Sequence, residues 1–183
     1  MTCLRRRHPA SWCLPATIFL FSLVLTACTS VPPPVPGGED AWSLTGRLGV
    51  RSGEQKGSFG IDWRQGHNAF DVTLFGPLGV TAARVYGDGE GVSMDVPGQG
   101  TVSAETPEAL IARTLGMDIP VTPMRYWVRG EPAPGPWRGD GDTIRQFGWQ
   151  VNWLARDASG LPTKIRLTRP EATLVLAIRA WSP

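Results

Sequence analysis

The sequence of 183 residues contains little cysteine and little histidine. Its three cysteines are Cys3, Cys13 and Cys28, and its two histidines are His8 and His67. A chain that starts at Cys28 would keep one residue of each kind. One cysteine cannot form an internal disulfide, and one cysteine with one histidine cannot supply the usual ligands of a zinc site. An enzyme of the Ser-His-Asp or Cys-His type would have to use His67.

The chain also lacks a clear excess of positive charge. It has 18 Lys and Arg residues against 16 Asp and Glu residues, a net charge of +2 at pH 7. Removing Arg5, Arg6 and Arg7 near the N-terminus leaves 15 basic and 16 acidic residues, a net charge of −1. A nucleic-acid-binding domain needs a strong basic excess. The composition therefore disfavours a nucleic-acid partner.

The N-terminal apolar stretch is too short to span a bilayer. It runs over 14 residues from Trp12 to Leu25, behind the basic segment Arg5–His8, whereas a spanning helix needs about 20 apolar residues. This pattern predicts a cleaved signal peptide over residues 1–27. It ends in Leu25-Thr26-Ala27-Cys28, which resembles the lipobox of bacterial lipoproteins. An ordinary secreted protein with a chance cysteine is the alternative.

If the lipobox is real, the mature chain starts at Cys28. We then expect a thioether-linked diacylglycerol and an amide-linked acyl chain on Cys28, which together anchor stably in a membrane. The next residue is Thr29 and not Asp, which by resemblance to bacterial lipoproteins implies the outer membrane of a Gram-negative cell. Residues 28–40 are rich in proline and glycine and are expected to be a tether that reaches up to roughly 30–40 Å.

From Trp42 onward, apolar and polar residues alternate in short runs separated by turn residues. This pattern predicts strands in an antiparallel meander. The expected strands are residues 44–50, 59–63, 70–74, 80–86, 92–96, 144–147, 149–153, 164–168 and 173–179. Thr106-Pro107-Glu108 and Thr122-Pro123 predict two short helices, and residues 131–142 predict a Pro/Gly loop.

The expected fold is mainly β. It is a single strongly curved antiparallel sheet of nine or ten strands, an unclosed half-barrel. The short helical insert covers its hydrophobic concave face. Residues 41–183 form this one domain, and the large apolar residues on the concave face form either a solid core or the lining of a cavity.

Four stretches resemble a known family in their order and spacing. They are Trp42 to Leu48, Gly76-Pro77-Leu78-Gly79, Thr106 to Gly130, and Gln146 to Val151 followed by Leu161-Pro162. With the lipobox, they resemble the LolB family of outer-membrane lipoprotein receptors. The resemblance implies an unclosed β-barrel with a helical lid and a hydrophobic cavity. It further implies that the chain accepts the acyl chains of lipoproteins from the periplasmic carrier LolA and inserts these lipoproteins into the inner leaflet of the outer membrane, without consuming a nucleotide.

The tip Gly76-Pro77-Leu78-Gly79 is the sharpest prediction for single residues. Gly76, Pro77 and Gly79 favour a chain reversal, at which Leu78 has little neighbouring surface to bury against. Leu78 either protrudes or folds back onto the edge of the sheet. In the family, a leucine at the tip of this loop protrudes and is needed for membrane delivery, so the resemblance assigns a membrane-insertion loop to these four residues.

Apolar residues of the inner face are candidates for an acyl-chain cavity. Each one taken singly is more often a plain core residue, and the spacing does not say which of them are loosely packed. The candidates are Leu48, Phe59, Ile61, Trp63, Phe70, Val72, Trp127, Trp149, Val151, Ile165 and Leu176.

Other functions stay open. An enzyme would rest on His67, which lies in a Gly-His-Asn turn of the kind that usually faces solvent. An envelope-assembly or structural lipoprotein would bind a protein or a glycan without acyl cargo, and a third kind of protein would bind lipid without transferring it. We expect no enzyme activity, no catalytic residue, no metal and no cofactor apart from the lipid on Cys28. The expected partners of this monomer are LolA, cargo lipoproteins and outer-membrane phospholipid.

Overall fold

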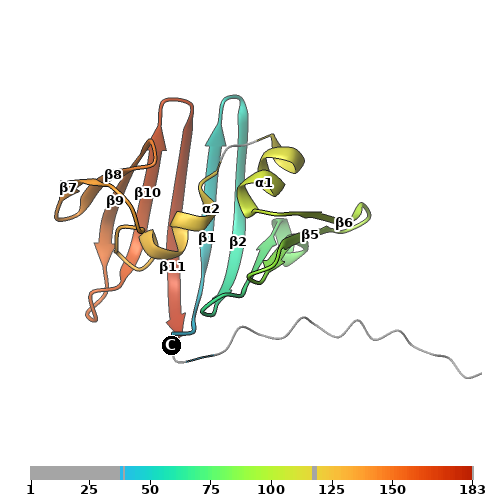
Figure 1. Cartoon of the computed structure of the whole chain (residues 1–183), viewed down its shortest axis with the longest axis horizontal. Coiled ribbons are helices and arrows are strands. Elements are labelled where there is room, and N and C mark those ends of the chain that lie inside the picture. Colours follow the sequence, from blue (N-terminus) through green and yellow to red (C-terminus); the bar gives the residue numbers. More distant parts are fainter. Residues whose placement is uncertain (1–37, 39, 117–118, 183) are drawn as a thin grey trace, which may run out of the picture. The chain divides into compact units, whose positions relative to one another are not determined.

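A computed structural model describes residues 38, 40–116 and 119–182 of the chain (Figure 1). The signal peptide over residues 1–27, Cys28 and most of the tether over residues 28–40 lie outside the described residues. All described residues belong to one compact unit, Pro33–Pro183. Because this unit has its own hydrophobic core and pairs its first strand with its last, we expect it to fold on its own.

In the described part of the chain, eleven strands form one antiparallel sheet in the order β6-β5-β4-β3-β2-β1-β11-β10-β9-β8-β7. The sheet is not closed, since β6 and β7 are its two edges. The strands are β1 (Trp42–Ser52), β2 (Gln55–Gln65), β3 (Phe70–Phe75), β4 (Thr81–Gly87), β5 (Val92–Val96), β6 (Gly100–Ala104), β7 (Arg138–Asp140), β8 (Thr143–Gln146), β9 (Trp149–Arg156), β10 (Pro162–Arg169) and β11 (Ala172–Ser182).

The alternating pattern of β1 shows why these segments pair as they do. Leu44 and Leu48 are buried, while Arg47 between them is exposed. Leu48 lies opposite Phe59 of β2 and Leu176 of β11. Since a slip of one residue would turn this apolar set to solvent, burial of one face fixes the register.

Two helices stand between β6 and β7 in the chain and cover the apolar face of the sheet (Figure 1). Helix α1 (Pro107–Leu115) begins at Thr106, whose side chain accepts a hydrogen bond of 3.2 Å from the Ala109 amide. It ends at Gly116, which has a left-handed conformation that glycine adopts without strain. Helix α2 (Val121–Trp127) follows and begins one residue before the expected Thr122.

The fold class expected from the sequence is confirmed, with two corrections to its elements. Strand β6 was not expected, and β7 lies inside residues 131–142, which were expected to be a loop. Both strands are edges of the sheet. All three residues of β7 are exposed, and β6 is exposed or half-buried throughout. Strands with so little buried surface carry no alternating apolar signal, because their pairing depends on backbone hydrogen bonds.

The interior is divided into two parts. We call strands β7–β11 with helix α2 the filled half, whose buried residues include Trp127, Trp149 and Trp153. We call strands β2–β6 with helix α1 the hollow half, where Leu110 and Ile111 of α1 pack on Val85, Val92 and Met94. Strand β1 lies between the two halves.

Candidate functional site

A cavity of about 350 Å³ lies between the sheet and the helices. Its wall comes mainly from β1–β5, with contributions from α1, α2 and β11. The lining residues are Leu48, Val50, Gln55, Lys56, Gly57, Phe59, Ile61, Trp63, Phe70, Val72, Leu74, Ala82, Ala83, Val85, Met94, Val96, Ile111, Ile119, Val121, Met124 and Leu174.

The chemistry of this wall is almost entirely apolar. Gln55 and Lys56 are its only residues with polar side chains among the described lining residues, and both are exposed at the start of β2. Phe59, Phe70 and Val72 are only half-buried, so part of their apolar surface is not covered by the protein. A cavity of this volume and lining suits an apolar ligand, which would remove that surface from water.

The structure separates the eleven cavity candidates into two sets. Leu48, Phe59, Ile61, Trp63, Phe70 and Val72 line the cavity. The other five lie in the packed core of the filled half instead: Trp127, Ile165 and Leu176 border only a gap of about 10 Å³, and Trp149 and Val151 of β9 are buried.

The sequence-based candidates left out much of the wall, namely residues of β4, β5 and the two helices such as Ala83, Val85, Met94, Ile111 and Met124. The alternation of β4 and β5 was visible, but small residues such as Ala83 do not stand out in an apolar pattern. The contribution of the helices depends on where the insert folds, which no local pattern gives.

In the filled half, hydrogen bonds hold buried tryptophans in place. The Trp127 Nε1 donates to Gln146 Oε1 at 2.9 Å. The same oxygen accepts from the Ala133 amide at 2.9 Å, and Gln146 Nε2 donates to the Ala133 carbonyl at 2.7 Å. Gln146 is buried, and these bonds offset the cost of placing its amide in the core. Together they fix the end of α2 against β8.

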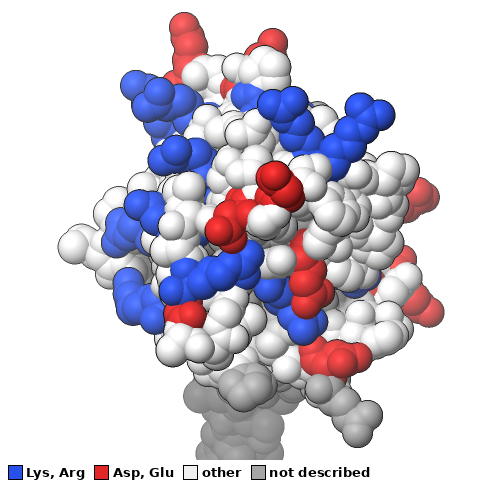
Figure 2. Space-filling model, turned by 90° about the vertical axis from the view of Figure 1, so that its left-hand side faces the viewer, with Lys and Arg blue, Asp and Glu red and all other residues white. Residues whose placement is uncertain are grey.

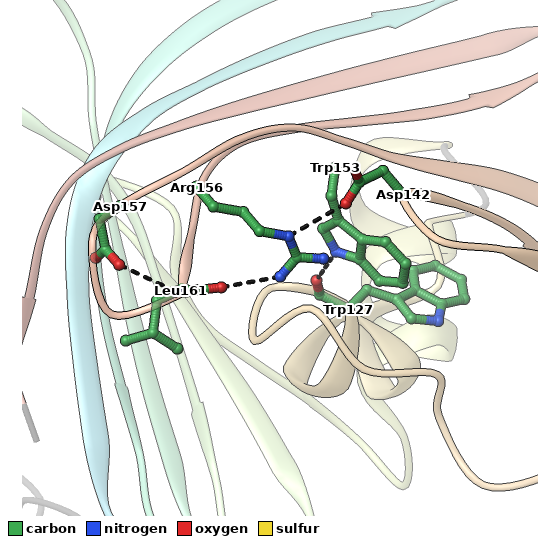
Figure 3. Close-up of polar contacts among 7 residues, drawn as sticks. Trp127, Asp142, Trp153, Arg156, Asp157 and Leu161 are labelled. Carbon is green, nitrogen blue, oxygen red and sulfur yellow. Dashed lines mark hydrogen bonds and ion pairs between the residues drawn. The ribbon is translucent and has the colours of Figure 1, made fainter.

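A second set of contacts ties the end of α2 to β9 and to the neighbouring turns (Figure 3). Trp153 Nε1 donates to the Trp127 carbonyl at the end of α2, at 2.6 Å. Arg156 lies over the Trp153 ring, 5.4 Å from its centre, and its Nε pairs with Asp142 at 3.2 Å. The Arg156 Nη1 also donates to the Gly160 carbonyl at 2.9 Å. The β7–β8 and β9–β10 turns are therefore tied to the helix through one arginine and one tryptophan.

Asp157 organises the β9–β10 turn. Its Oδ1 accepts from the Ser159 hydroxyl at 2.6 Å and from the Leu161 amide at 3.0 Å. The hydrogen bond from the Ser159 side chain is the main cause that lowers the pKa of Asp157 below its ordinary value of 3.8.

Helix α1 is held mostly by contacts at its ends. Glu108 accepts from the Thr122 amide at 2.6 Å and from its hydroxyl at 3.1 Å, which ties α1 to α2. Arg113 donates to the Ser103 carbonyl on β6. These residues are at the surface, and among the side chains of α1 that the structure describes, Leu110 and Ile111 belong to the buried core.

The loop between β3 and β4 presents Leu78 to solvent. Gly76 donates from its amide to the Val80 carbonyl at 2.8 Å and closes the loop. Leu78 and Gly79 both have a left-handed backbone, with φ of 61° and 77°. The Leu78 side chain is 102% exposed and that of Val80 65%. Leu78 therefore does not fold back onto the edge of the sheet, which was the other position open from the sequence.

The Leu78 tip adjoins the cavity. Leu74 and Ala82, each four residues from Leu78 along the chain, lie on the cavity wall. Val50 and Gly57 near the β1–β2 hairpin lie on it as well. In the antiparallel sheet, the β1–β2 and β3–β4 connections are at the same end of the strands. One end of the cavity thus lies close to the exposed tip.

The described residues offer no other obvious chemistry. Within them, no group of three or more His, Cys, Asp or Glu side chains is placed to hold a metal ion. His67 is exposed, lies 3.9 Å from Asp40 and is not one of the residues that line the cavity. None of the helices described is both long and apolar enough to cross a bilayer.

Comparisons of the sequence with known proteins show its family. The family model "Outer membrane lipoprotein LolB" matches residues 40–181. The chain belongs to the LolB family. The outer-membrane lipoprotein LolB of Stutzerimonas stutzeri is 38% identical over 154 residues, which cover 79% of this chain and 75% of that protein. The LolB of Alkalilimnicola ehrlichii is 32% identical over 187 residues, covering 89% and 94%.

As a member of the LolB family, the chain is an outer-membrane lipoprotein anchored by lipid. The family consists of lipoprotein receptors of the localisation pathway and is not a known enzyme family. Among solved structures, a LolA superfamily protein from Nitrosomonas europaea aligns with a TM-score of 0.48 and 9% identity, over 81% of this chain and 88% of that chain.

Proposed function

We propose that this LolB-family protein accepts lipoproteins from the periplasmic carrier LolA and inserts them into the inner leaflet of the outer membrane. The observation that carries the proposal is the placement of an apolar cavity of about 350 Å³ beside a fully exposed leucine. The acyl chains of the cargo would occupy the cavity, and Leu78 would enter the membrane at the end where the chains leave.

Apolar burial keeps the acyl chains out of water at both steps. Each methylene exposed to water would cost about 0.8 kcal/mol, so the chains pass from one apolar site to the next, and the difference in apolar burial between the carrier, the cavity and the bilayer drives the transfer. No group that binds nucleotides or metals is required for such a downhill transfer. The half-buried Phe59, Phe70 and Val72 provide the uncovered wall.

The Leu78 tip suits insertion because its position is unfavourable for a soluble protein. A left-handed backbone costs a leucine about 1–2 kcal/mol relative to its usual conformations, and the side chain buries nothing in the domain. Insertion of this leucine in a bilayer would bury that side chain and bring the cavity to the membrane surface.

The lipid anchor is part of the proposal. Cys28 would carry the diacylglycerol and N-acyl groups, and residues 28–40 would tether the monomer to the outer membrane. The transfer itself would depend on the folded unit. We therefore expect a Cys28→Ala protein to accept cargo, and failure of this variant to take cargo would contradict that division of roles.

A transfer assay tests the function. The unit 33–183 is mixed with LolA loaded with a lipoprotein, and liposomes are then added. We expect wild type to take the cargo and pass it on, and the Leu78→Glu variant to take it but to retain it, because a carboxylate does not enter the apolar layer. Leu154→Glu is the matched control, since Leu154 on β9 is 43% exposed and lies outside the cavity wall.

Two results would overturn the proposal. If no cargo moves onto the wild-type unit, the protein does not accept lipoproteins through this domain, and a role in envelope assembly becomes the better explanation. If Leu78→Glu delivers cargo as well as Leu154→Glu does, the tip is not the element that contacts the membrane.

A further inference from the structure

Only two non-glycine residues in the described part of the chain have a left-handed backbone, Leu78 with φ of 61° and Phe147 with φ of 50°. Phe147 and Gly148 form the two-residue turn between β8 and β9, because Gln146 and Trp149 pair directly. Gly148 also has a positive φ, 77°. A turn with two such residues is the type that favours Asn-Gly.

Phenylalanine is a poor choice for this turn on two grounds. The left-handed backbone strains a residue with a bulky side chain, and the Phe147 side chain is 54% exposed. The Leu78-Gly79 tip shares both features, an exposed apolar residue in left-handed conformation followed by a left-handed glycine. Two turns of the molecule thus hold a large apolar side chain where folding alone would favour asparagine.

The two turns lie at the same end of the strands. Because neighbouring strands alternate in direction, the β1–β2, β3–β4, β8–β9 and β10–β11 connections are all at one end of the strands. In Figure 1 this is the upper end, where the β1–β2 and β10–β11 hairpins stand. The Gly53 amide donates to the Glu171 carbonyl at 3.0 Å and joins these two hairpins. Leu78 and Phe147 therefore lie at the same end of the strands, Leu78 in the hollow half and Phe147 in the filled half.

An open groove of about 620 Å³ lies beside Phe147. Trp137, which is 47% exposed, lines it. So do Arg138, Arg145 and Arg169, and no acidic residue is among the described residues of the lining. The guanidinium of Arg169 lies 4.8 Å from the centre of the Trp149 ring. Figure 2, which faces this side of the molecule, shows Lys and Arg side chains over its upper and middle parts, with Asp and Glu side chains among them.

We propose that Phe147 and Trp137 form a second membrane contact, with the arginines of the groove bound to lipid phosphates. The inference rests on the proposed function, in which the end of the sheet that carries Leu78 faces the outer membrane. Tryptophan and phenylalanine with nearby arginine are the residues that proteins place at the boundary between headgroups and acyl chains. Arginine also matches the geometry and charge of phosphate oxygens.

A bilayer fits these residues better than a water-exposed surface does. The two contacts stand on the two halves of the sheet, Leu78 on the hollow half and Phe147 on the filled half. Contact at one point would let the domain rotate freely on the membrane. Contact at two points holds this end of the strands, where the cavity ends, against the bilayer. The Phe147 contact would then orient the domain for delivery.

Single cysteines report insertion directly, since residues 33–183 contain no cysteine. Leu78→Cys, Phe147→Cys and Leu154→Cys variants are labelled with an environment-sensitive dye. They are mixed with vesicles of phosphatidylethanolamine and phosphatidylglycerol. We expect a blue shift at positions 78 and 147 and none at 154. A shift at 78 alone overturns the second contact and leaves the proposed function intact, whereas no shift at 78 removes its membrane step.

Flotation with the same vesicles measures the strength of the contact. We expect Phe147→Asn to weaken vesicle binding about tenfold, because the exposed aromatic ring that would enter the bilayer is lost, while its thermal unfolding stays as high as that of wild type. We expect the double variant Arg138→Gln, Arg145→Gln to weaken binding to these anionic vesicles more than to phosphatidylcholine vesicles, in which choline balances the phosphate charge, and added salt to cancel the difference. Wild-type vesicle binding by Phe147→Asn, with reduced uptake from loaded LolA, would assign the groove to a protein partner and overturn the membrane contact.

Discussion

The two halves of the sheet share one fold but differ in what fills them. In the filled half, Trp127, Trp149 and Trp153 are buried, and the interior gap that Trp127 borders is about 10 Å³. In the hollow half, the small residues Ala82 and Ala83 line the cavity, which leaves about 350 Å³ open. The difference in side-chain volume on one continuous sheet determines where the cavity lies.

The halves differ equally in how their helices are held. Two buried hydrogen bonds fix the end of α2, one that Trp127 donates to Gln146 and one that Trp153 donates to the Trp127 carbonyl. The polar contacts of α1 are on the surface, at Glu108 and Arg113. Buried bonds in a packed core are lost only at high cost, and exposed ones exchange with water. The filled half therefore acts as the rigid frame, and the hollow half can accept a ligand without breaking that frame.

The largest expected effect comes from removing the buried Trp127 side chain from the filled half. We expect Trp127→Ala to lower the free energy of unfolding by about 3–5 kcal/mol, because it leaves a large cavity and removes the partner of Gln146. Urea unfolding measures the change. Phe59→Ala in the cavity wall should cost clearly less, since Phe59 is only half-buried. Equal losses would show that the two halves are packed alike.

Adding volume tests the same contrast from the other side. We expect Ala172→Leu, in the buried core of the filled half, to cost about 1–3 kcal/mol through overpacking. Ala83→Leu points into the open cavity and should leave stability within about 1 kcal/mol of wild type, while it lowers the affinity for a fluorescent acyl probe. The two variants are compared by urea unfolding and probe titration. A loss of stability in Ala83→Leu as large as in Ala172→Leu would mean that the cavity has no usable space.

The two strained tips are a feature that both halves share. We expect Leu78→Asn to raise the free energy of unfolding by about 1 kcal/mol, because asparagine tolerates the left-handed backbone. Phe147→Asn should gain less, since the Phe147 ring lies against Gly135, where a Cβ would be 3.4 Å from its Cζ atom. Urea unfolding of both variants checks the order. A net loss of stability in Leu78→Asn would show that Leu78 packs against the domain in solution.

The smallest expected effect concerns the turn that borders the frame. The lowered pKa of Asp157 means that its charged form stabilises the fold above the ordinary pKa of 3.8, and that this contribution is lost as the pH falls through the lower, folded-state value. We expect Asp157→Asn to be slightly less stable than wild type at neutral pH and to converge with it in strong acid. Thermal unfolding across the acid range measures this convergence. A difference that stays constant with pH would assign the effect to the turn's shape and not to its charge.

The elements with alternating apolar residues were predictable, and those that pair through backbone alone were not. Strand β1 and helix α1 carry complete local signals, alternation in the first and the Thr106 cap and Gly116 terminus in the second. Strands β6 and β7 carry none, because they are edges with little buried surface.

The candidate site was predictable in its tip and only partly in its cavity. Gly76, Pro77 and Gly79 define the turn locally, so the position of Leu78 followed from the sequence. For the cavity, an inner-facing residue such as Trp149 looks the same in sequence as Trp63. Trp149 belongs to the buried core of the filled half, and only Trp63 lines the apolar cavity.

The sequence by itself determined the strand pattern, the two helices, the loop that carries Leu78 and the family. These depend on residues that are close along the chain, through period, capping and turn chemistry. Only the tertiary structure decided which inner residues face the cavity, that Leu78 is exposed and does not pack on the sheet, and that Phe147 lies at the same end of the strands as Leu78. Those properties depend on how volumes from distant strands add up and on which connections the antiparallel topology brings to one end.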